Sequence, residues 1–352
     1  MSLDAPSETL TPVRDVHRFD EASLAAHLRS VSDEFKGTIA VRQFAGGQSN
    51  PTFLLESGGR KYVLRKKPPG KLLQSAHQVD REYRVMKALA GTDVPVPRMV
   101  TLCMDDAVIG TAFYVMEYVT GRIFRDPQLP GVPPQERAAI YDSMNDVLAK
   151  LHNVDIDAVG LSDYGKPGNY YQRQIARWIK QYRDAQTGDV RSMEALIRWM
   201  PENIPADASV SIAHGDFRLE NSIYHPTEPR MIAVLDWELS TIGNPLADLG
   251  YNCMGYHMIS PTQGGLLGLD FKATGIPDEE TYVRRYCERT GRNYPLANWN
   301  FYLSFAIFRL AAIAQGVYRR GLDGNASSEK AALYGNACQF LSDAAEKIAG
   351  IS

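Results

Sequence analysis

The chain has 352 residues, more than one small hydrophobic core accommodates, and its length predicts two lobes or domains. Hydrophobic residues make up 44% and charged residues 22%, as in an ordinary globular enzyme. The 38 Lys and Arg residues nearly balance the 41 Asp and Glu residues, so the net charge of -3 argues against a nucleic-acid-binding or membrane-surface protein.

The cysteines and the N-terminus indicate the cellular compartment of the protein. The four cysteines lie far apart and form no C-x-x-C pair, so we expect free thiols rather than a zinc site or disulfides. The N-terminus lacks the basic and apolar blocks of a signal peptide, and no later stretch approaches the roughly 20 apolar residues of a membrane span. We therefore expect a cytoplasmic protein.

The N-terminal part alternates between helical and extended patterns. Apolar residues at helical spacing predict a helix over 19–31, with Asp20 as its N-cap. Alternating residues at 39–44, 52–55 and 62–65, separated by paired glycines, predict three antiparallel strands.

A helix over 75–90 follows and ends before Pro95, and two further strands are expected at 98–104 and 112–118. Five antiparallel strands and one helix, behind the N-terminal helix, would form a first lobe over residues 1–119. We expect this lobe to bind a nucleotide.

The remaining residues, 120–352, have mainly helical periodicity and are expected to form a second lobe that carries catalysis and substrate binding. Three short strands at 210–213, 222–224 and 231–235 interrupt it, and their loops hold unusual polar residues. The predicted helices are 135–152, 170–186, 191–200, 245–258, 278–290, 299–319 and 328–349.

Three polar residues in these loops have the spacing of a phosphoryl-transfer site. Such transfer needs a carboxylate that accepts the hydroxyl proton and oxygen ligands for magnesium. Asp216 and Asn221 are five residues apart, as in H-R-D-x-x-x-x-N, and Asp236 ends the apolar strand 232–235. Each residue alone is explained by a turn or a helix cap, but together they predict a kinase that uses ATP and Mg²⁺.

The motifs HGDFRLEN (214–221) and DWE (236–238) resemble those of the aminoglycoside phosphotransferase and choline kinase-like family. With Arg218, Glu220 and the segment LRKKPPG (64–70), they resemble more closely the kinase-like domain fused to some acyl-CoA dehydrogenases. The resemblance covers roughly residues 44–250. It implies an α+β, protein-kinase-like bilobal fold, with a five-stranded antiparallel first lobe and a mainly α-helical second lobe.

The resemblance also implies residue roles. It makes Asp216 the catalytic base and makes Asn221 and Asp236 magnesium ligands. Four neighbours support the site in this interpretation. His214 braces the loop, and Arg218 meets a phosphate or an acidic substrate or pairs with Glu220 or Asp236. Glu238 supports the metal or starts a helix, and Asp248 ties the second lobe to the catalytic loop or is an ordinary helix carboxylate.

The nucleotide-binding residues are expected in the first lobe. A loop that covers the phosphates would comprise Gly46, Gly47, Gln48, Ser49 and Asn50, although a plain hairpin turn explains the glycines equally well. Arg65 stands where the related kinases have lysine, and strand alternation places it with Lys67 on the face opposite Leu64 and Lys66.

Two further features complete the expected nucleotide site. By the resemblance, Glu82 on the helix 75–90 holds Arg65 in place, although it would need no explanation as a surface residue. Backbone groups of Glu117 to Val119 would meet adenine, and Met116 would line the pocket or pack in the core.

Two other classes of function remain open. A kinase-shaped nucleotide-binding module without catalysis is favoured only by the change from lysine to Arg65. A metal-dependent hydrolase built on His214, Asp216, His225 and Asp236 is the other, but such sites usually gather more imidazoles or bridging carboxylates.

The acceptor is expected to be a small molecule that carries a hydroxyl group. No acidic run near the catalytic loop would attract a polycationic aminoglycoside, and the dehydrogenase-linked resemblance favours a hydroxyacyl compound, whose negative charge Arg309, Arg319 and Arg320 would tolerate. We expect no nucleic-acid or membrane partner, and a homodimer stays open. Residues that could line the pocket or merely pack are Tyr170, Tyr171, Arg173, Tyr251, Tyr256, Arg309 and Tyr318.

Overall fold

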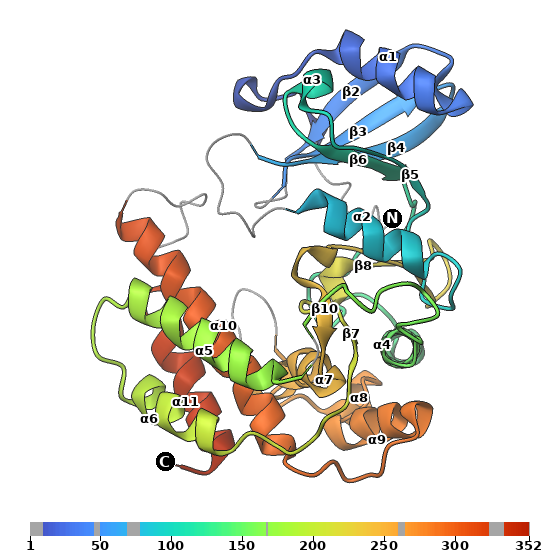
Figure 1. The fold of residues 1–352 in the computed structure, drawn as a ribbon. Helices are drawn as coiled ribbons and strands as arrows, with labels where there is room; N and C mark the ends of the chain where they lie inside the picture. Colours follow the sequence, from blue (N-terminus) through green and yellow to red (C-terminus); the bar gives the residue numbers. More distant parts are fainter. Residues whose placement is uncertain are drawn as a thin grey trace. The chain divides into compact units, whose positions relative to one another are not determined.

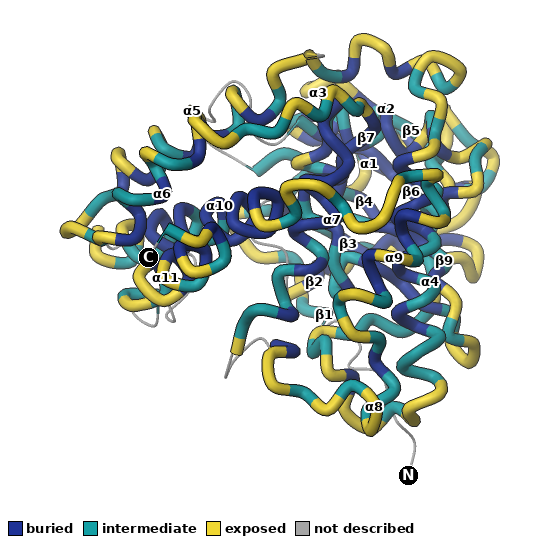
Figure 2. The backbone as a smooth tube through the Cα atoms, turned by 90° about the horizontal axis from the view of Figure 1, so that it is seen from below, coloured by how far each residue is buried: buried dark blue, intermediate teal, exposed yellow. Residues whose placement is uncertain are grey.

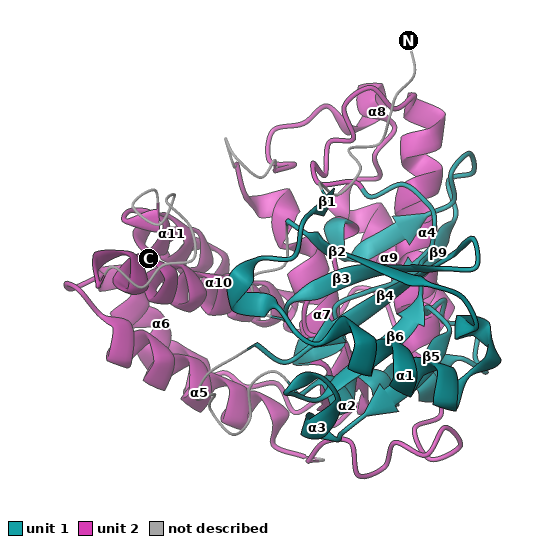
Figure 3. Ribbon diagram, turned by 90° about the horizontal axis from the view of Figure 1, so that it is seen from above, with its two compact units in different colours: residues 1–123, 220–239 teal, residues 124–219, 240–352 magenta. Residues whose placement is uncertain are grey.

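A computed structural model describes residues 10–45, 50–68, 78–166, 168–259, 265–323 and 334–351. The chain divides into two compact units, each of which is formed by two separate segments of sequence (Figure 3). Unit 1 comprises Met1–Ile123 and Glu220–Leu239, and unit 2 comprises Phe124–Leu219 and Ser240–Ser352.

This division corrects the expected boundary at residue 119, because residues 220–239 belong to the first unit. Backbone hydrogen bonds explain why. The N–H of Arg122 donates to the carbonyl of Tyr224, and the N–H of Tyr224 donates to the carbonyl of Arg122, both at 2.8 Å. The N–H of Val234 donates to the carbonyl of Pro95 at 2.9 Å.

A six-stranded sheet in the order β1-β2-β3-β4-β6-β5 forms most of unit 1 (Figure 1). All neighbouring strands are antiparallel, which confirms the expected sheet, but β1 adds a sixth strand that the polar N-terminus did not predict. The strands are β1 (Leu10–Thr11), β2 (Ile39–Phe44), β3 (Thr52–Ser57), β4 (Arg60–Lys66), β5 (Met99–Cys103) and β6 (Phe113–Glu117).

The two faces of this sheet carry different helices. Helix α1 (Glu21–Val31) begins at the predicted N-cap Asp20, whose Oδ1 accepts a hydrogen bond from the N–H of Ala22 at 2.8 Å. Its residues Leu24 and Leu28 pack in the apolar core of the sheet. Short helices accompany it: η1 (Asp15–His17), η2 (Asp33–Phe35) and α3 (Asp106–Ile109).

Helix α2 (Val79–Leu89) brings Glu82 to the side chains of Arg65 and Tyr114. Because neighbouring strand residues Leu64 and Val115 lie in the apolar core beside α1, α2 covers the opposite face. The described part of the predicted helix 75–90 is thereby confirmed.

The segment from 220 to 239 is a hairpin of β8 (Ser222–Tyr224) and β9 (Met231–Val234), flanked by η3 (Leu219–Asn221) and η4 (Trp237–Leu239). Trp237 is fully buried and its Nε1 donates to the carbonyl of Val234 at 3.0 Å. This bond fixes the turn that follows β9.

Unit 2 is mainly helical, as expected, and contains one antiparallel pair of strands, β7 (Ser211–Ala213) and β10 (Thr241–Gly243). The sequence did not predict β10. The last helix begins only at residue 337, and residues 328–333 of its predicted range lie outside the described residues. The helices are α4 (Pro134–His152), α5 (Tyr170–Ala185), α6 (Arg191–Glu202), α7 (Pro245–Cys253), η5 (Met254–His257), α8 (Phe271–Thr274), α9 (Glu279–Thr290), α10 (Trp299–Leu322) and α11 (Ala337–Ala349).

Helix α10 is the central helix of unit 2 and packs against α5, α7 and α11. It is long and apolar enough to cross a membrane, with a mean hydropathy of 1.4 over 18 residues, which the sequence analysis did not anticipate. However, 78% of that window is buried inside the unit (Figure 2), as in the core helix of a folded domain.

Candidate active site

Arg65 lies among three carboxylates of unit 1. Alternation along β4 turns its side chain away from Leu64, as predicted, while Lys66 is buried beside the rings of Phe19 and Phe53. The Nη1 of Arg65 lies 3.0 Å from Oε2 of Glu82 on α2. The structure thus contains the ion pair that the family resemblance implies.

Glu82 is fully buried and bound on both oxygens. Its Oε1 accepts a hydrogen bond from Nδ2 of Asn50 at 2.9 Å, and its Oε2 accepts one from the hydroxyl of Tyr114 at 3.0 Å. Burial, together with the negative charges of Asp236 and Glu238, raises the pKa of Glu82 to about 7, although Arg65 acts in the opposite direction.

Asn50 was expected to contact a phosphate, but its side chain instead binds Glu82. Its side chain is 1% exposed and holds Glu82, because a carboxylate buried this deeply requires hydrogen-bond donors. The other four residues of the expected phosphate loop, Gly46 to Ser49, lie outside the described residues.

Arg65 also contacts two carboxylates that follow β9. Its Nη2 lies 2.9 Å from Oδ1 of Asp236 and 3.6 Å from Oε2 of Glu238. One guanidinium thus meets three carboxylates, counting Glu82, and leaves this part of unit 1 with an excess of negative charge. Such an excess favours a cation.

The backbone brings Asn221 and Asp236 together. The N–H of Leu235 donates to the carbonyl of Asn221 at 2.8 Å, so the two predicted magnesium ligands lie at the same end of the hairpin. Asp236 has a φ of 65°, in the left-handed region, where Asp is enriched but a side chain is usually disfavoured. The chain bends there and turns the carboxylate toward Arg65.

These ligands have the chemistry that Mg²⁺ requires. Magnesium is typically held by one or two protein oxygens, with phosphates and water completing the octahedron, and an amide oxygen and a carboxylate fit that pattern. No group of three or more His, Cys, Asp or Glu side chains that could hold a metal occurs among the described residues.

The end of β6 has the expected hinge residues. Met116 is buried, and the N–H groups of Glu117 and Tyr118 donate to the carbonyls of Arg98 and Lys61. Within the part of the chain that the structure describes, the N–H of Val119 has no intramolecular acceptor.

The catalytic loop in unit 2 is fixed by Asp248. Its Oδ2 accepts a hydrogen bond from the N–H of His214 at 2.6 Å, and its Oδ1 accepts one from the N–H of Gly215 at 2.9 Å. His214 is fully buried, and its Nδ1 accepts from the N–H of Asp216 at 3.1 Å. His214 braces the loop and Asp248 anchors it, which matches the expected contacts of both residues.

The position of Asp248 follows from helix α7. Asn244 caps the helix by accepting from the N–H of Leu246, and Pro245 occupies its first turn. Burial raises the pKa of Asp248, but a hydrogen bond from His152 and one from the backbone of Gly215 outweigh it and lower the pKa below its ordinary value. The anchor is therefore ionised at neutral pH.

Two groups meet Oδ1 of Asp216. The hydroxyl of Tyr251 donates to it at 2.5 Å, and Nε of Arg218 lies 3.3 Å away. Burial and the charge of Asp216 raise the pKa of Tyr251, so its hydroxyl keeps the donated proton. The pairing of Arg218 with Asp216 was not among the alternatives considered from the sequence.

The role of Tyr251 could have been inferred from helical spacing. It lies three residues after Asp248 on α7, and residues three apart occupy one face of a helix. That face meets the catalytic loop through both residues. Without the predicted contact of Asp248, however, nothing in the sequence separates Tyr251 from a core tyrosine.

Arg309 on α10 also contacts the catalytic loop. Its Nη2 donates to the carbonyl of Gly215 at 2.5 Å, and its guanidinium lies 5.1 Å from the centre of the Tyr251 ring. Arg319, which was also expected to favour a negatively charged acceptor, instead pairs with Asp323 at 3.1 Å.

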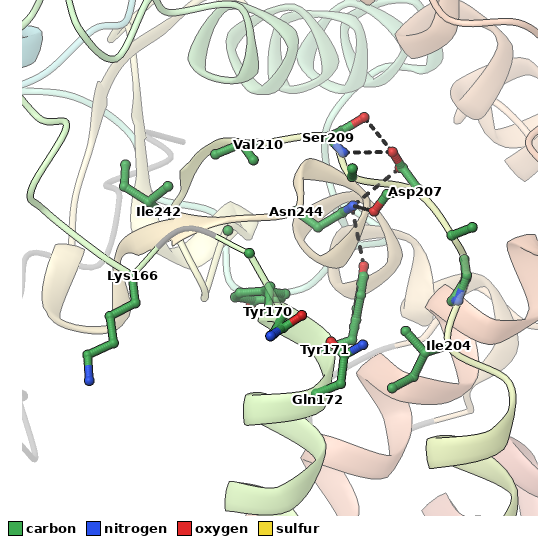
Figure 4. Close-up of a pocket in the computed structure, with 16 residues that line it drawn as sticks. Lys166, Tyr170, Tyr171, Gln172, Ile204, Asp207, Ser209, Val210, Ile242 and Asn244 are labelled. Atoms are coloured by element: carbon green, nitrogen blue, oxygen red, sulfur yellow. Dashed lines mark hydrogen bonds between the residues drawn. The ribbon is translucent and has the colours of Figure 1, made fainter.

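A cavity of about 310 Å³ lies in unit 2 beside the start of α5 (Figure 4). Tyr170 and Tyr171 line it, and Asn244 donates there to Asp207 at 3.2 Å. Gly243 also lines the cavity and pairs with Ser211, the first residue of β7. The catalytic loop leaves from the other end of β7, after Ala213. The cavity is therefore separate from Asp216.

Comparisons with known proteins agree with this arrangement. Residues 40–288 match the phosphotransferase enzyme family. The chain is 46% identical to mouse acyl-CoA dehydrogenase family member 10 over 337 residues, which are 95% of this chain but only 31% of that protein. The chain thus spans about a third of the length of this relative.

Solved structures show the same fold. The crystal structure of a candidate aminoglycoside phosphotransferase from Ralstonia eutropha has a TM-score of 0.87 and 50% identity, covering 95% of this chain and 99% of that one. A thermostable mutant of an aminoglycoside phosphotransferase, in a ternary complex with ADP and hygromycin B, has a TM-score of 0.59 and 18% identity, covering 92% and 98%. The α+β, protein-kinase-like fold is thereby shown, and the chain belongs to the phosphotransferase enzyme family.

Proposed function

We propose that the protein transfers the γ-phosphate of ATP, with Mg²⁺, to a hydroxyl group of a small molecule. The observation that carries the proposal is the fixed position of Asp216, on a loop that Asp248 anchors and beside the donor Tyr251. A carboxylate fixed in this way is suited to orient a hydroxyl and accept its proton.

The groups of unit 1 suit the nucleotide. Asn221 and Asp236 would hold Mg²⁺, which would neutralise charge on the phosphates. Arg65, held by Glu82, has the fork geometry that binds phosphate oxygens in pairs. The complex of a distant structural relative with ADP supports a nucleotide at such a site.

We propose a hydroxyacyl compound rather than an aminoglycoside as the acceptor. Arg218 and Arg309 place two positive charges beside the segment Gly215 to Asp216. These charges repel an aminoglycoside, which is a polycation, and attract an acid. The relatedness to acyl-CoA dehydrogenase family members supports an acyl substrate.

The test measures ADP release with kanamycin, choline and a 4-hydroxyacyl thioester as acceptors. We expect turnover of the thioester, and turnover of kanamycin alone would contradict the proposed acceptor. Magnesium-dependent stabilisation by ATP without turnover of any hydroxyl compound would contradict the kinase and favour the silent nucleotide-binding module.

Two variants separate the proposed roles. Asp216→Asn removes the proton acceptor, so we expect kcat to fall by about 10² to 10⁴ while ATP still raises the melting temperature. Asp236→Asn should instead abolish the magnesium dependence of that rise. The exposed Asp93→Asn, in unit 1, serves as the control and should change neither. A near-normal rate for Asp216→Asn excludes it as the base.

A further inference from the structure

Two arginines of unit 2 share one indole ring. The guanidinium of Arg177 on α5 lies 5.3 Å from the centre of the Trp178 ring, and that of Arg309 on α10 lies 5.3 Å from the same ring. Trp178 is 5% exposed and Arg309 8%, whereas Arg177 is exposed at the surface. Two positive charges therefore flank the same buried ring, one of them buried and the other at the surface.

No carboxylate balances this charge within the described ranges. Neither Arg177 nor Arg309 has an acidic oxygen within 4.0 Å there, although most other arginines near the helices of unit 2 are paired. Desolvation and the charge of Arg309 lower the pKa of Arg177, which reflects the cost of two neighbouring cations. A bound anion would remove that cost.

Two buried donors at the same place also lack acceptors. Among the described residues, Nε of Arg309 and Nε1 of Trp178 are buried without a hydrogen-bond partner. Buried donors are paired in the great majority of cases, and an unpaired one costs about 1–3 kcal/mol. The two donors belong to side chains that are in contact, so an acceptor that reached both would remove this cost.

The cluster contacts the catalytic loop through Arg309, and its charges act on a tyrosine that lines the cavity. Arg309 donates to the carbonyl of Gly215 and lies over Tyr251, which holds Asp216. The charges of Arg309 and Arg177 also act on Tyr170, which lines the cavity (Figure 4). A ligand bound by Arg309 would therefore lie next to the segment that carries Asp216.

We propose that Arg177, Arg309 and Trp178 form an oxyanion-binding subsite that holds a phosphate or carboxylate group of the phosphate acceptor. The assignment to the acceptor rests on the proposed function. Planar guanidinium groups bind both oxyanions through paired, charge-assisted hydrogen bonds, and the indole N–H adds a further donor. Arg177, at the surface, is the residue that an arriving anion meets first.

The first experiment titrates the full chain with inorganic phosphate and, separately, with acetate, at constant ionic strength and with Mg–ADP present. It compares wild type with Arg177→Gln and with Lys180→Gln, a matched control that removes one positive charge from the same helix but at an exposed residue paired with Asp184. The thermal shift at each anion concentration gives the affinity.

We expect Arg177→Gln to weaken phosphate binding about tenfold, the loss of one charge-assisted contact, and Lys180→Gln to leave it unchanged. An equal loss for acetate identifies a subsite that also accepts carboxylates, and a loss for phosphate alone identifies a phosphate subsite. Equal phosphate affinity in wild type and Arg177→Gln, or an equal loss in Lys180→Gln, overturns the proposal.

The second experiment measures ADP release. Arg177→Gln should raise KM for an acceptor with a phosphate or carboxylate about tenfold, leave kcat unchanged, and leave KM for a neutral hydroxyl compound unchanged. An unchanged KM for the charged acceptor overturns the proposal. Absence of ADP release with every acceptor would instead refute the proposed function, and the phosphate titration does not depend on turnover.

Discussion

Replacing Glu82 with Gln should make the stability of the protein less dependent on pH and make the protein less able to use ATP. The carboxylate of Glu82 is fully buried among Arg65, Asn50 and Tyr114. Glutamine has nearly the same shape and keeps one oxygen for these donors, but it carries no charge. The stability change therefore reports the cost of an ionised carboxylate at this position.

The magnitude follows from the pKa of Glu82, which burial raises from the ordinary value of 4.5 to about 7. Because the folded protein keeps this proton to higher pH than the unfolded chain does, the free energy of unfolding of the wild type falls as pH rises from about 4.5 to about 7. The full shift corresponds to about 3 kcal/mol. Glutamine does not titrate, so the variant lacks this loss.

Urea unfolding at pH 5 and at pH 8 measures the effect. We expect the stability of Glu82→Gln relative to wild type to increase by about 2.5 kcal/mol between the two pH values, somewhat less than the full shift because pH 5 lies above the ordinary pKa of 4.5. We also expect KM for ATP to rise, because Arg65 loses one of its three carboxylate partners. The control is Glu56→Gln, at a half-buried glutamate paired with the exposed Arg42, which should cost less than about 1 kcal/mol at either pH. A relative stability of Glu82→Gln that is the same at both pH values refutes the reasoning.

Two further variants test the catalytic loop and the hairpin. Tyr251→Phe removes the donor to Asp216. A hydrogen bond to a charged group contributes about 1.5–3 kcal/mol, so we expect kcat to fall at least tenfold while the circular dichroism spectrum stays unchanged. A wild-type kcat would exclude Tyr251 from positioning the base. In Gly121→Ala the new Cβ would lie 2.3 Å from the carbonyl oxygen of Tyr224, so we expect a loss of about 1–3 kcal/mol in the free energy of unfolding, whereas Gly91→Ala, which meets nothing within 4 Å, should lose none. Equal stabilities of the two alanine variants would contradict the close approach at Gly121.

The elements of the fold followed from local patterns. The strands β2, β3, β4 and β6 were predicted from the sequence, and each has one face in the apolar core. The N-cap Asp20 correctly predicted that α1 begins at Glu21. The strands β1 and β10 were missed because two or three residues carry no measurable period. Their pairing depends on partners about 30 residues away in sequence.

The site could be predicted only where spacing determines contact. Asp216 and Asn221 were proposed from their separation and Asp236 from its place at the end of an apolar strand, and the family resemblance predicted the ion pair of Arg65 with Glu82. The hydrogen bond of Tyr251 to Asp216 joins residues 35 apart, and only the spacing of Tyr251 from Asp248, whose own contact was itself a prediction, could have indicated it. Asn50 was misassigned for the opposite reason, because its sequence neighbours suggested a phosphate loop and its side chain is bound to a distant glutamate instead.

The two-segment construction of unit 1 restricts how this enzyme can be divided. A fragment that ends at Ile123 contains Arg65 and Glu82 but lacks Asp236, which supplies another of the charges around that arginine. The shortest continuous stretch of gene that encodes the whole unit runs to Leu239, and it necessarily includes Asp216 from the other unit. Recombination at a single point therefore cannot exchange unit 1 alone, because it either leaves residues 220–239 behind or carries residues of unit 2 along.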